Sequence, residues 1–300
     1  MSIRSSFGGT HRFMSHVSAL YAFTAHTFTN CGVTGATGPT LAQMQAAYSG
    51  QSWAQDSNFF TLGAYQGYQK WKVPASGNYT FDVRGAAGGA TGYNPTYPGR
   101  GARAQTTLAL VAGEWLAIVV GQAGSFGGLV GGGGGGSFVV RLSDNTPLII
   151  AGGGAGAFQL QDHRSNGDAP AAEAAQVGTH YVGNTQGAPG AGGFYSNGAN
   201  SVRDSGGMGY GSGLTGSPRN VGESGRGGFG GGSSGEWVYY GSTGHGGGYS
   251  GGSRNNTGYG GLCSSYYSAG GGSLISASGS SSALTAGYNS GAGSVAITKV

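Results

Sequence analysis

The stretch "VGGGGGGSFVVRL" (residues 130–142) joins six consecutive glycines to an apolar run, and these two features decide the fold. The run "SFVVRL" (137–142) and the later "PLIIAGG" (147–153) are short, apolar and rich in β-branched residues, with the turn sequence "SDNT" between them. This pattern predicts a pair of buried β-strands. The order of strands and glycine runs recurs along the chain, so the fold depends on what the glycines do.

Other segments also predict strands. In "WKVPASGNYTFDVRGAAGG" (71–89), Tyr79, Phe81 and Val83 alternate with polar residues after a Pro-Ala-Ser-Gly turn, which is the period of a half-buried strand. The apolar runs 108–111 and 115–120 flank an Ala-Gly-Glu turn, and "GSVAITKV" (293–300) predicts a final strand. One short helix is expected over 40–50, with Thr40 as its N-cap and Gly50 as its stop. The sequence therefore predicts an all-β protein with little α-helix.

Glycine makes up 69 of the 300 residues, about three times its ordinary share. The triplet spacing in "CGVTGATGPT" (31–40) lapses after three cycles and the chain has only 8 prolines, which excludes collagen. Most glycine runs lie in 151–290. We divide the chain into a leader (1–27), sandwich strands (28–150), a glycine-rich region (151–290) and a C-terminal strand (291–300).

Glycine- and serine-rich segments are ordinarily flexible linkers. Here the runs reach at most six residues and recur between segments that carry aromatics, which a linker does not need. Ordered glycine runs can form extended helices of three residues per turn, which satisfy their backbone polar groups only by bonding to neighbours. The sequence thus favours a bundle of polyglycine helices, in which Gly230→Val is expected to destabilise the fold strongly.

The residues that carry catalysis or bind metals form no convincing constellation. There is no P-loop, the six histidines lack metal-ligand spacing, and Asp162, His163 and Asp168 are expected to be a solvated loop. Cys31 and Cys263 either pair or remain free thiols. We predict no enzyme activity, no catalytic residues, no metal and no cofactor.

Charge and hydropathy argue against nucleic acid as a partner and against a membrane-spanning helix. A net charge of +4 without a basic run gives no case for nucleic acid, and no apolar stretch approaches the length of a membrane helix. The patch 17–25 is too short for a convincing secretory leader. Residues 1–55 contain no acidic residue, so Arg4 and Arg12 are candidates for attachment to an acidic partner, although a short solvated leader is the simpler interpretation.

From residue 28 onward the chain resembles the glycine-rich extracellular domain of the anaplastic lymphoma kinase and leukocyte tyrosine kinase receptors. The similar opening begins at His26, and the specific parts are the block "CGVTGATGPT" (31–40) and the strand "WKVP" (71–74). Further similar segments follow in the same order: 85–89, 119–124, 131–136, 147–154 and 225–232. The resemblance implies a jelly-roll β-sandwich, similar to tumour necrosis factor, with an inserted polyglycine-helix bundle, and the analogy suggests a trimer.

These observations together predict a non-enzymatic structural protein of a bacteriophage virion. It would be a tail-fibre adhesin or a capsid decoration, bound to other virion proteins through its N-terminal segment. The alternative is a bacterial extracellular protein for structure or cell–cell adhesion. In either setting, loop aromatics suit contact with a host glycan or an outer-membrane protein, and packing inside the protein is the alternative for each of them. The candidate ligand-binding residues are Trp237, Tyr239, Tyr240, Tyr249, Arg254, Tyr259, Tyr266 and Tyr267.

Overall fold

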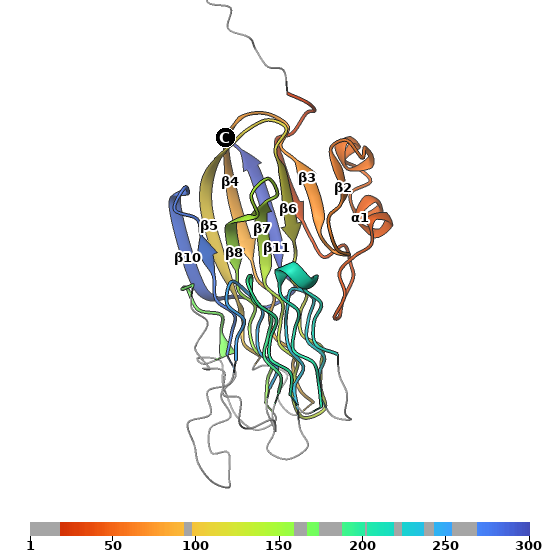
Figure 1. The fold of residues 1–300 in the computed structure, drawn as a ribbon, viewed down its shortest axis with the longest axis vertical. Helices are drawn as coiled ribbons and strands as arrows, with labels where there is room; N and C mark the ends of the chain where they lie inside the picture. Colours follow the sequence, from red (N-terminus) through yellow and green to blue (C-terminus); the bar gives the residue numbers. More distant parts are fainter. Residues whose placement is uncertain are drawn as a thin grey trace, which may run out of the picture.

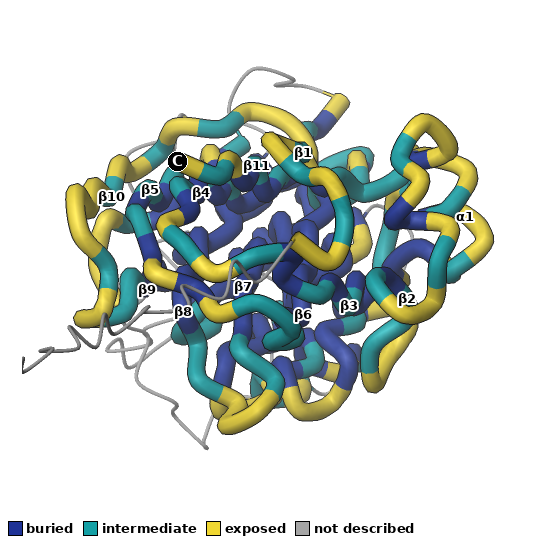
Figure 2. Tube along the Cα trace, turned by 90° about the horizontal axis from the view of Figure 1, so that it is seen from above, coloured by how far each residue is buried: buried dark blue, intermediate teal, exposed yellow. Residues whose placement is uncertain are grey.

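The computed structural model describes residues 19–92, 98–158, 167–173, 188–201, 203–218, 224–236, 243–253 and 269–300. Most of its regular structure is β-sheet, in two antiparallel sheets, with little helix, which confirms the all-β prediction. Figure 1 shows the strands in one half of the molecule and the glycine-rich segments as neighbouring threads in the other. Figure 2, viewed from above, shows the buried residues concentrated between the sheets.

The first sheet has five strands in the order β1 (Ala25–Phe28), β11 (Ser294–Lys299), β4 (Gly77–Arg84), β5 (Gly101–Leu110) and β10 (Ser280–Asn289). The second has six, in the order β2 (Phe60–Leu62), β3 (Gln69–Lys72), β6 (Trp115–Val119), β7 (Ser137–Arg141), β8 (Thr146–Ala151) and β9 (Leu274–Ile275). Every neighbouring pair is antiparallel.

Local sequence pattern accounts for how single elements form. Tyr79, Phe81 and Val83 of β4 are buried in the core while the residues between them are partly exposed, as their alternation predicts. The predicted helix is α1 (Leu41–Ala47), and Thr40 caps it in a capping box with Gln43. Two short 3₁₀ helices, η1 (Ser52–Gln55) and η2 (Tyr210–Ser212), complete the helical elements of the described residues.

Two turns that separate strands in the sequence carry the chain from one sheet to the other. β3 and β4 flank the Pro-Ala-Ser turn but belong to different sheets, and the same is true of β5 and β6. The two crossings are bonded to each other, since Val73 N–H donates to the Glu114 carbonyl at 2.9 Å and Gly113 N–H donates to the Val73 carbonyl at 2.9 Å. Only the 137–153 segment forms the strand pair that its sequence suggests, β7 with β8.

The predicted division of the chain differs from the structure at two boundaries. β1 begins at Ala25, inside the predicted leader, and Leu20 N–H already donates to the Pro74 carbonyl at 2.8 Å. β9 and β10 lie inside the predicted glycine-rich region. Because β8 and β9 are paired neighbours, residues 152–273 are an insertion between adjacent strands of one sheet.

The hexaglycine 131–136 is completely buried and leads directly into β7. Its six N–H groups donate to three neighbouring segments in turn, over N···O distances between 2.8 and 3.2 Å. Residues 131 and 134 donate to 154–157, residues 132 and 135 to 122–125, and residues 133 and 136 to 230–233. Glycines three positions apart therefore donate to the same neighbouring segment.

Close approach, rather than unusual backbone conformation, is what requires glycine in this run. None of the six residues has a positive φ. A Cβ at Gly133 would fall well inside 3.0 Å of the backbone of His245, and one at Gly135 would overlap the backbone of Phe229. The glycine runs therefore pack backbone against backbone, which no residue with a side chain permits without displacement.

Candidate functional site

The candidate residues chosen from sequence mostly lie outside the described residues. Among the eight aromatic and arginine candidates the structure describes Tyr249 alone, and both Arg4 and Arg12 fall in the undescribed N-terminal segment. Tyr249 is partly buried and packs against a hydrophobic cluster beside the second sheet. Its carbonyl accepts from the Phe194 N–H at 2.8 Å, which ties it to a turn that sequence analysis did not single out.

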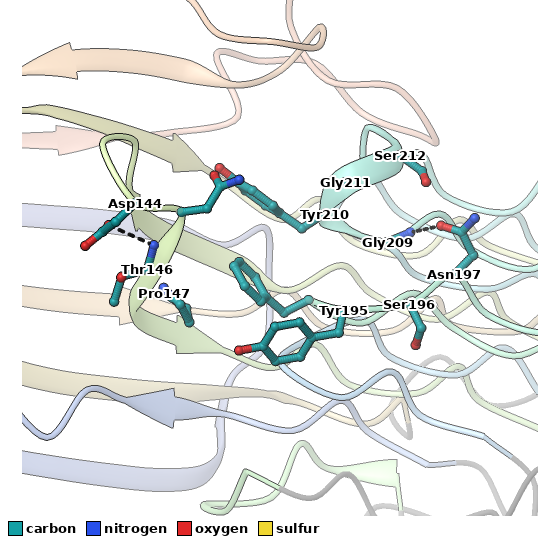
Figure 3. A pocket seen from close by; sticks show the side chains of 12 residues that line it. Asp144, Thr146, Pro147, Tyr195, Ser196, Asn197, Gly209, Tyr210, Gly211 and Ser212 are labelled. Carbon is teal, nitrogen blue, oxygen red and sulfur yellow. Dashed lines mark hydrogen bonds between the residues drawn. The ribbon is translucent and has the colours of Figure 1, made fainter.

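That turn borders a hollow of about 740 Å³ where the second sheet meets the glycine runs (Figure 3). Three segments far apart in the sequence line it: the β7–β8 turn at 144–147, the turn at 194–197, and residues 209–212 around η2. A second hollow of about 470 Å³ is lined by 190–191, 195–199, 249–251 and Ser253. The two share residues 195–197, so they adjoin at this turn.

A series of aromatic rings links the hollows to the sheet. Phe194 stacks on Tyr210 with 4.9 Å between ring centroids, and Tyr210 lies 5.1 Å from Tyr68. The Tyr68 hydroxyl donates to the Tyr210 carbonyl at 2.5 Å, and the Tyr65 hydroxyl donates to the Gly211 carbonyl at 2.6 Å. Two tyrosines of the β2–β3 connection thus bond to η2 and position it.

Tyr195 is the large exposed residue of this site. Its side chain is 76% exposed, whereas Phe194 and Tyr210 are only 7% and 8% exposed. The Tyr195 ring meets Phe194 and Tyr249 nearly edge-on, at centroid distances of 4.9 and 5.8 Å. Burial raises the pKa of Tyr210 to about 12, so this phenol stays neutral near neutral pH.

The rim of the larger hollow is polar and has a fixed geometry. The Asn197 Oδ1 accepts from the Gly209 N–H at 2.8 Å, and Figure 3 shows the amide nitrogen of Asn197 directed away from Gly209. The Asp144 Oδ1 accepts from the Thr146 N–H at 3.1 Å. This backbone bond, with a smaller contribution from Arg141, holds the pKa of the Asp144 carboxyl below its usual value. The arrangement can stack a ring and exchange hydrogen bonds, but it contains no paired acid and base.

A second polar cluster lies among the glycine runs. Asp204 and Glu236 are each 5% exposed, and burial raises the pKa of both carboxyls. The Ser234 hydroxyl donates to the Asp204 Oδ2 at 2.8 Å, and Arg203 lies 3.6 Å from Glu236. Within the described parts of the chain, no three His, Cys, Asp or Glu side chains form a group that could hold a metal.

The structure describes one residue of the Asp162, His163 and Asp168 cluster, and it also describes Cys31. Asp168 is partly buried, and its Oδ1 accepts from the Arg100 N–H at 2.6 Å. Asp162 and His163 lie outside the described residues. Cys31 is a free thiol, whose sulfur lies 3.4 Å from the Tyr48 hydroxyl, and burial raises its pKa.

The site residues found by structure but not by sequence are Phe194, Tyr195, Asn197, Tyr210 and Asp144. The sequence feature that indicates this site is the aromatic pair in "GGFYSN" (192–197). It lies between two glycine runs, as do the segments that supplied the candidate ligand-binding residues.

Comparison with known proteins gives limited information. No family model matches the chain. Over 100 residues, which are 32% of this chain, it is 37% identical to the leukocyte tyrosine kinase receptor of Mus musculus. The match covers 11% of that receptor, so the similarity concerns one region of it. None of the helices that the structure describes has the length and apolar character needed to cross a bilayer.

Proposed function

We propose that this chain is a non-enzymatic binding module, in which a jelly-roll sandwich carries a rigid bundle of polyglycine helices. The module presents the bundle and its grooves to a partner on a cell surface. The hydrogen bonding of residues 131–136 is the observation that carries the proposal, because a flexible linker would leave these groups to water.

Three properties of the hexaglycine support an extended helix of three residues per turn. Its N–H groups return to the same neighbour after every third residue, its φ angles are not positive, and it has no bonds within itself. These are the properties of the polyproline-II conformation. Its carbonyls accept hydrogen bonds with the same three-residue repeat. Those of 131 and 134 accept from Gly244 and Gly247, and those of 132 and 135 accept from Gly89 and Ala86.

The origin of the neighbouring runs supports a rigid connection to the sandwich. The run 85–89 continues β4, 120–125 continues β6, and 152–158 continues β8. Each of these three runs donates or accepts hydrogen bonds with 131–136. Because the ends of the strands fix where the runs begin, ordering the glycines costs less entropy than it would in an isolated chain.

The similarity to part of a receptor supports a binding role outside the cell. It supports the second setting considered from sequence, a bacterial extracellular adhesion protein, which we therefore propose beside the first setting, a phage tail or capsid protein. Attachment through Arg4 and Arg12 and assembly as a trimer remain predictions. Proteomics of purified particles and of washed cell envelopes separates the two settings, and light scattering of the purified chain gives the oligomeric state.

Surface binding is tested with fluorescently labelled chain and cells of the bacterial host or source. The proposal predicts saturable labelling that an excess of unlabelled chain displaces. A matched control is the same chain unfolded and alkylated before labelling. If the folded chain labels cells no better than this control, a surface-binding role is refuted.

A further inference from the structure

We propose that the adjoining hollows around Tyr195 bind a neutral glycan. This inference rests on the proposed binding function and specifies its ligand class. It starts from size and position: hollows of about 740 and 470 Å³ fall in the range of small-molecule sites, and they adjoin along one side of the molecule.

Tyr195 supplies the stacking surface. A pyranose ring presents a face of C–H groups with a rim of hydroxyls, and an exposed aromatic face receives such C–H groups through its negative π-system. Tyr195 lies at the boundary of both hollows and remains 76% exposed, although edge-on contacts with Phe194 and Tyr249 limit the motion of its ring. A sugar can therefore stack on a ring that is already positioned.

The backbone that carries Tyr195 is held on both sides. Gly193 N–H donates to the Ser196 carbonyl and Phe194 N–H to the Tyr249 carbonyl, both at 2.8 Å. The neighbouring η2 segment is bonded to Tyr68 and Tyr65. A site whose parts are fixed before binding loses less entropy on association, which favours recognition of a small ligand.

The polar groups around the rings match hydroxyls. The Asn197 amide is oriented by its bond to Gly209, so its nitrogen remains available to donate. Asp144 accepts, and the Ser196 and Ser212 hydroxyls can do either. Hydroxyl groups, which both donate and accept, are the complement of such a mixed rim.

Charge selects neutral sugars over acidic ones. Among the described residues that line the two hollows, Asp144 is the single charged side chain, and no described Lys or Arg lines either of them. Arg141 pairs with Asp144, with 3.8 Å between their charged groups, but it is not among the residues that line the hollow. A phosphate, sulfate or sialic acid would meet the Asp144 carboxylate with no Lys or Arg among the described lining residues to bind it, at a cost in affinity.

The shape also favours a sugar over a peptide. Among the described lining residues, Phe194 and Tyr210 are already buried, which leaves Tyr195 as the large exposed aromatic face. Peptide recognition ordinarily uses several side-chain pockets or a free sheet edge. One exposed aromatic ring surrounded by polar groups is sufficient for stacking a sugar ring, whereas a peptide site needs more contacts.

The test measures binding of neutral oligosaccharides by saturation-transfer NMR and titration. The panel contains trisaccharides of glucose, galactose, mannose and N-acetylglucosamine, with sialyllactose as an acidic comparison. We expect at least one neutral trisaccharide to bind, and Tyr195→Ala to weaken it by at least about tenfold, as for a central aromatic contact. Tyr195→Phe, which keeps the ring face, should stay within about threefold of the original chain.

Phe126→Ala is the matched control, since Phe126 is 61% exposed but lines neither hollow. It should bind the sugar as the original chain does. No binding of any neutral trisaccharide overturns the proposal, as does binding that Tyr195→Ala leaves unchanged or a clear preference for sialyllactose.

Cell labelling separates this proposal from the proposed function. Periodate, which cleaves the vicinal diols of sugars, should abolish labelling, whereas protease treatment should not. If the cells are labelled but labelling is lost only with protease, or is equal for Tyr195→Ala, the glycan proposal is refuted while surface binding stands. If a trisaccharide binds through Tyr195 but no cells are labelled, the site stands and surface binding fails.

Discussion

Gly133→Ala tests whether glycine is needed for close backbone approach. Gly133 is buried in the hexaglycine, its N–H donates to the Ser233 carbonyl at 2.8 Å, and its carbonyl accepts from the Gly228 N–H at 2.8 Å. The backbone conformation is no obstacle to alanine, because φ is not positive. The added methyl would instead lie far inside 3.0 Å of the His245 backbone, so the runs must separate.

The expected loss combines two effects. Forcing a methyl group into a packed interior costs about 1–3 kcal/mol. Separating the runs also weakens at least two hydrogen bonds, at about 0.5–1.5 kcal/mol each. The sum, about 2–6 kcal/mol, is a large part of the 5–15 kcal/mol by which native proteins are ordinarily stable. At roughly 2–4 °C per kcal/mol, the melting temperature should fall by about 4–24 °C.

Differential scanning calorimetry of the purified variant measures this fall. Gly50→Ala is the matched control: Gly50 is exposed, has no positive φ, and an added Cβ there meets nothing within 4 Å. The control should be unchanged or gain up to about 1 kcal/mol, because alanine reduces the entropy of the unfolded chain. If Gly133→Ala melts within about a degree of the original chain, the backbone packing described at this run is wrong.

Gly230→Val should destabilise strongly in a thermal melt, because Gly230 has φ +104° and an added Cβ would lie 2.5 Å from the Gly136 carbonyl oxygen; an unchanged melt would contradict both reasons. Burial lowers the pKa of His26 to about 4, so the unfolded chain binds more protons below pH 6.5 and stability should fall as pH drops from 6.5 to 4. His26→Phe should reduce the difference between melts at pH 7 and pH 5, and an equal difference would refute this assignment. Burial raises the pKa of Asp204, which makes its charged form unfavourable at neutral pH. Asp204→Asn should therefore raise the melting temperature at pH 7 but not at pH 3. The same gain at both pH values would argue against this cause.

Single elements of the fold were predictable because their signals are local. Thr40 caps α1 as its position in "TLAQ" suggests, and Phe81 and its alternating neighbours are buried in β4. The partners of the strands were not predictable in the same way. The turns at 73–76 and 111–114 have the composition of hairpin turns, yet they cross between the sheets, because Val73 bonds to residues of the second turn. That contact joins residues about forty positions apart, which no local pattern reveals.

The candidate site was harder to predict for the same reason. Its lining comes from 144–147, 194–197 and 209–212, which meet only when the glycine runs pack beside β7 and β8. The sequence indicated that aromatics between glycine runs matter, and it identified Tyr249 on this basis. It did not distinguish Tyr195, which is exposed, from Phe194, which is buried, because neighbouring aromatics in a turn have no period that assigns a face.

The central claim is that the glycine runs are rigidly ordered by hydrogen bonds to one another. Amide hydrogen exchange of residues 130–142 tests this claim most directly. The segment contains the hexaglycine and β7, so one peptide compares a glycine run with a strand of the sheet. If the N–H groups of 131–136 are bonded to three neighbouring segments, they should exchange as slowly as those of β7, at least about a thousandfold slower than an unstructured chain. Exchange of these six amides at the rate of a free glycine linker, with β7 still protected, would contradict the bundle.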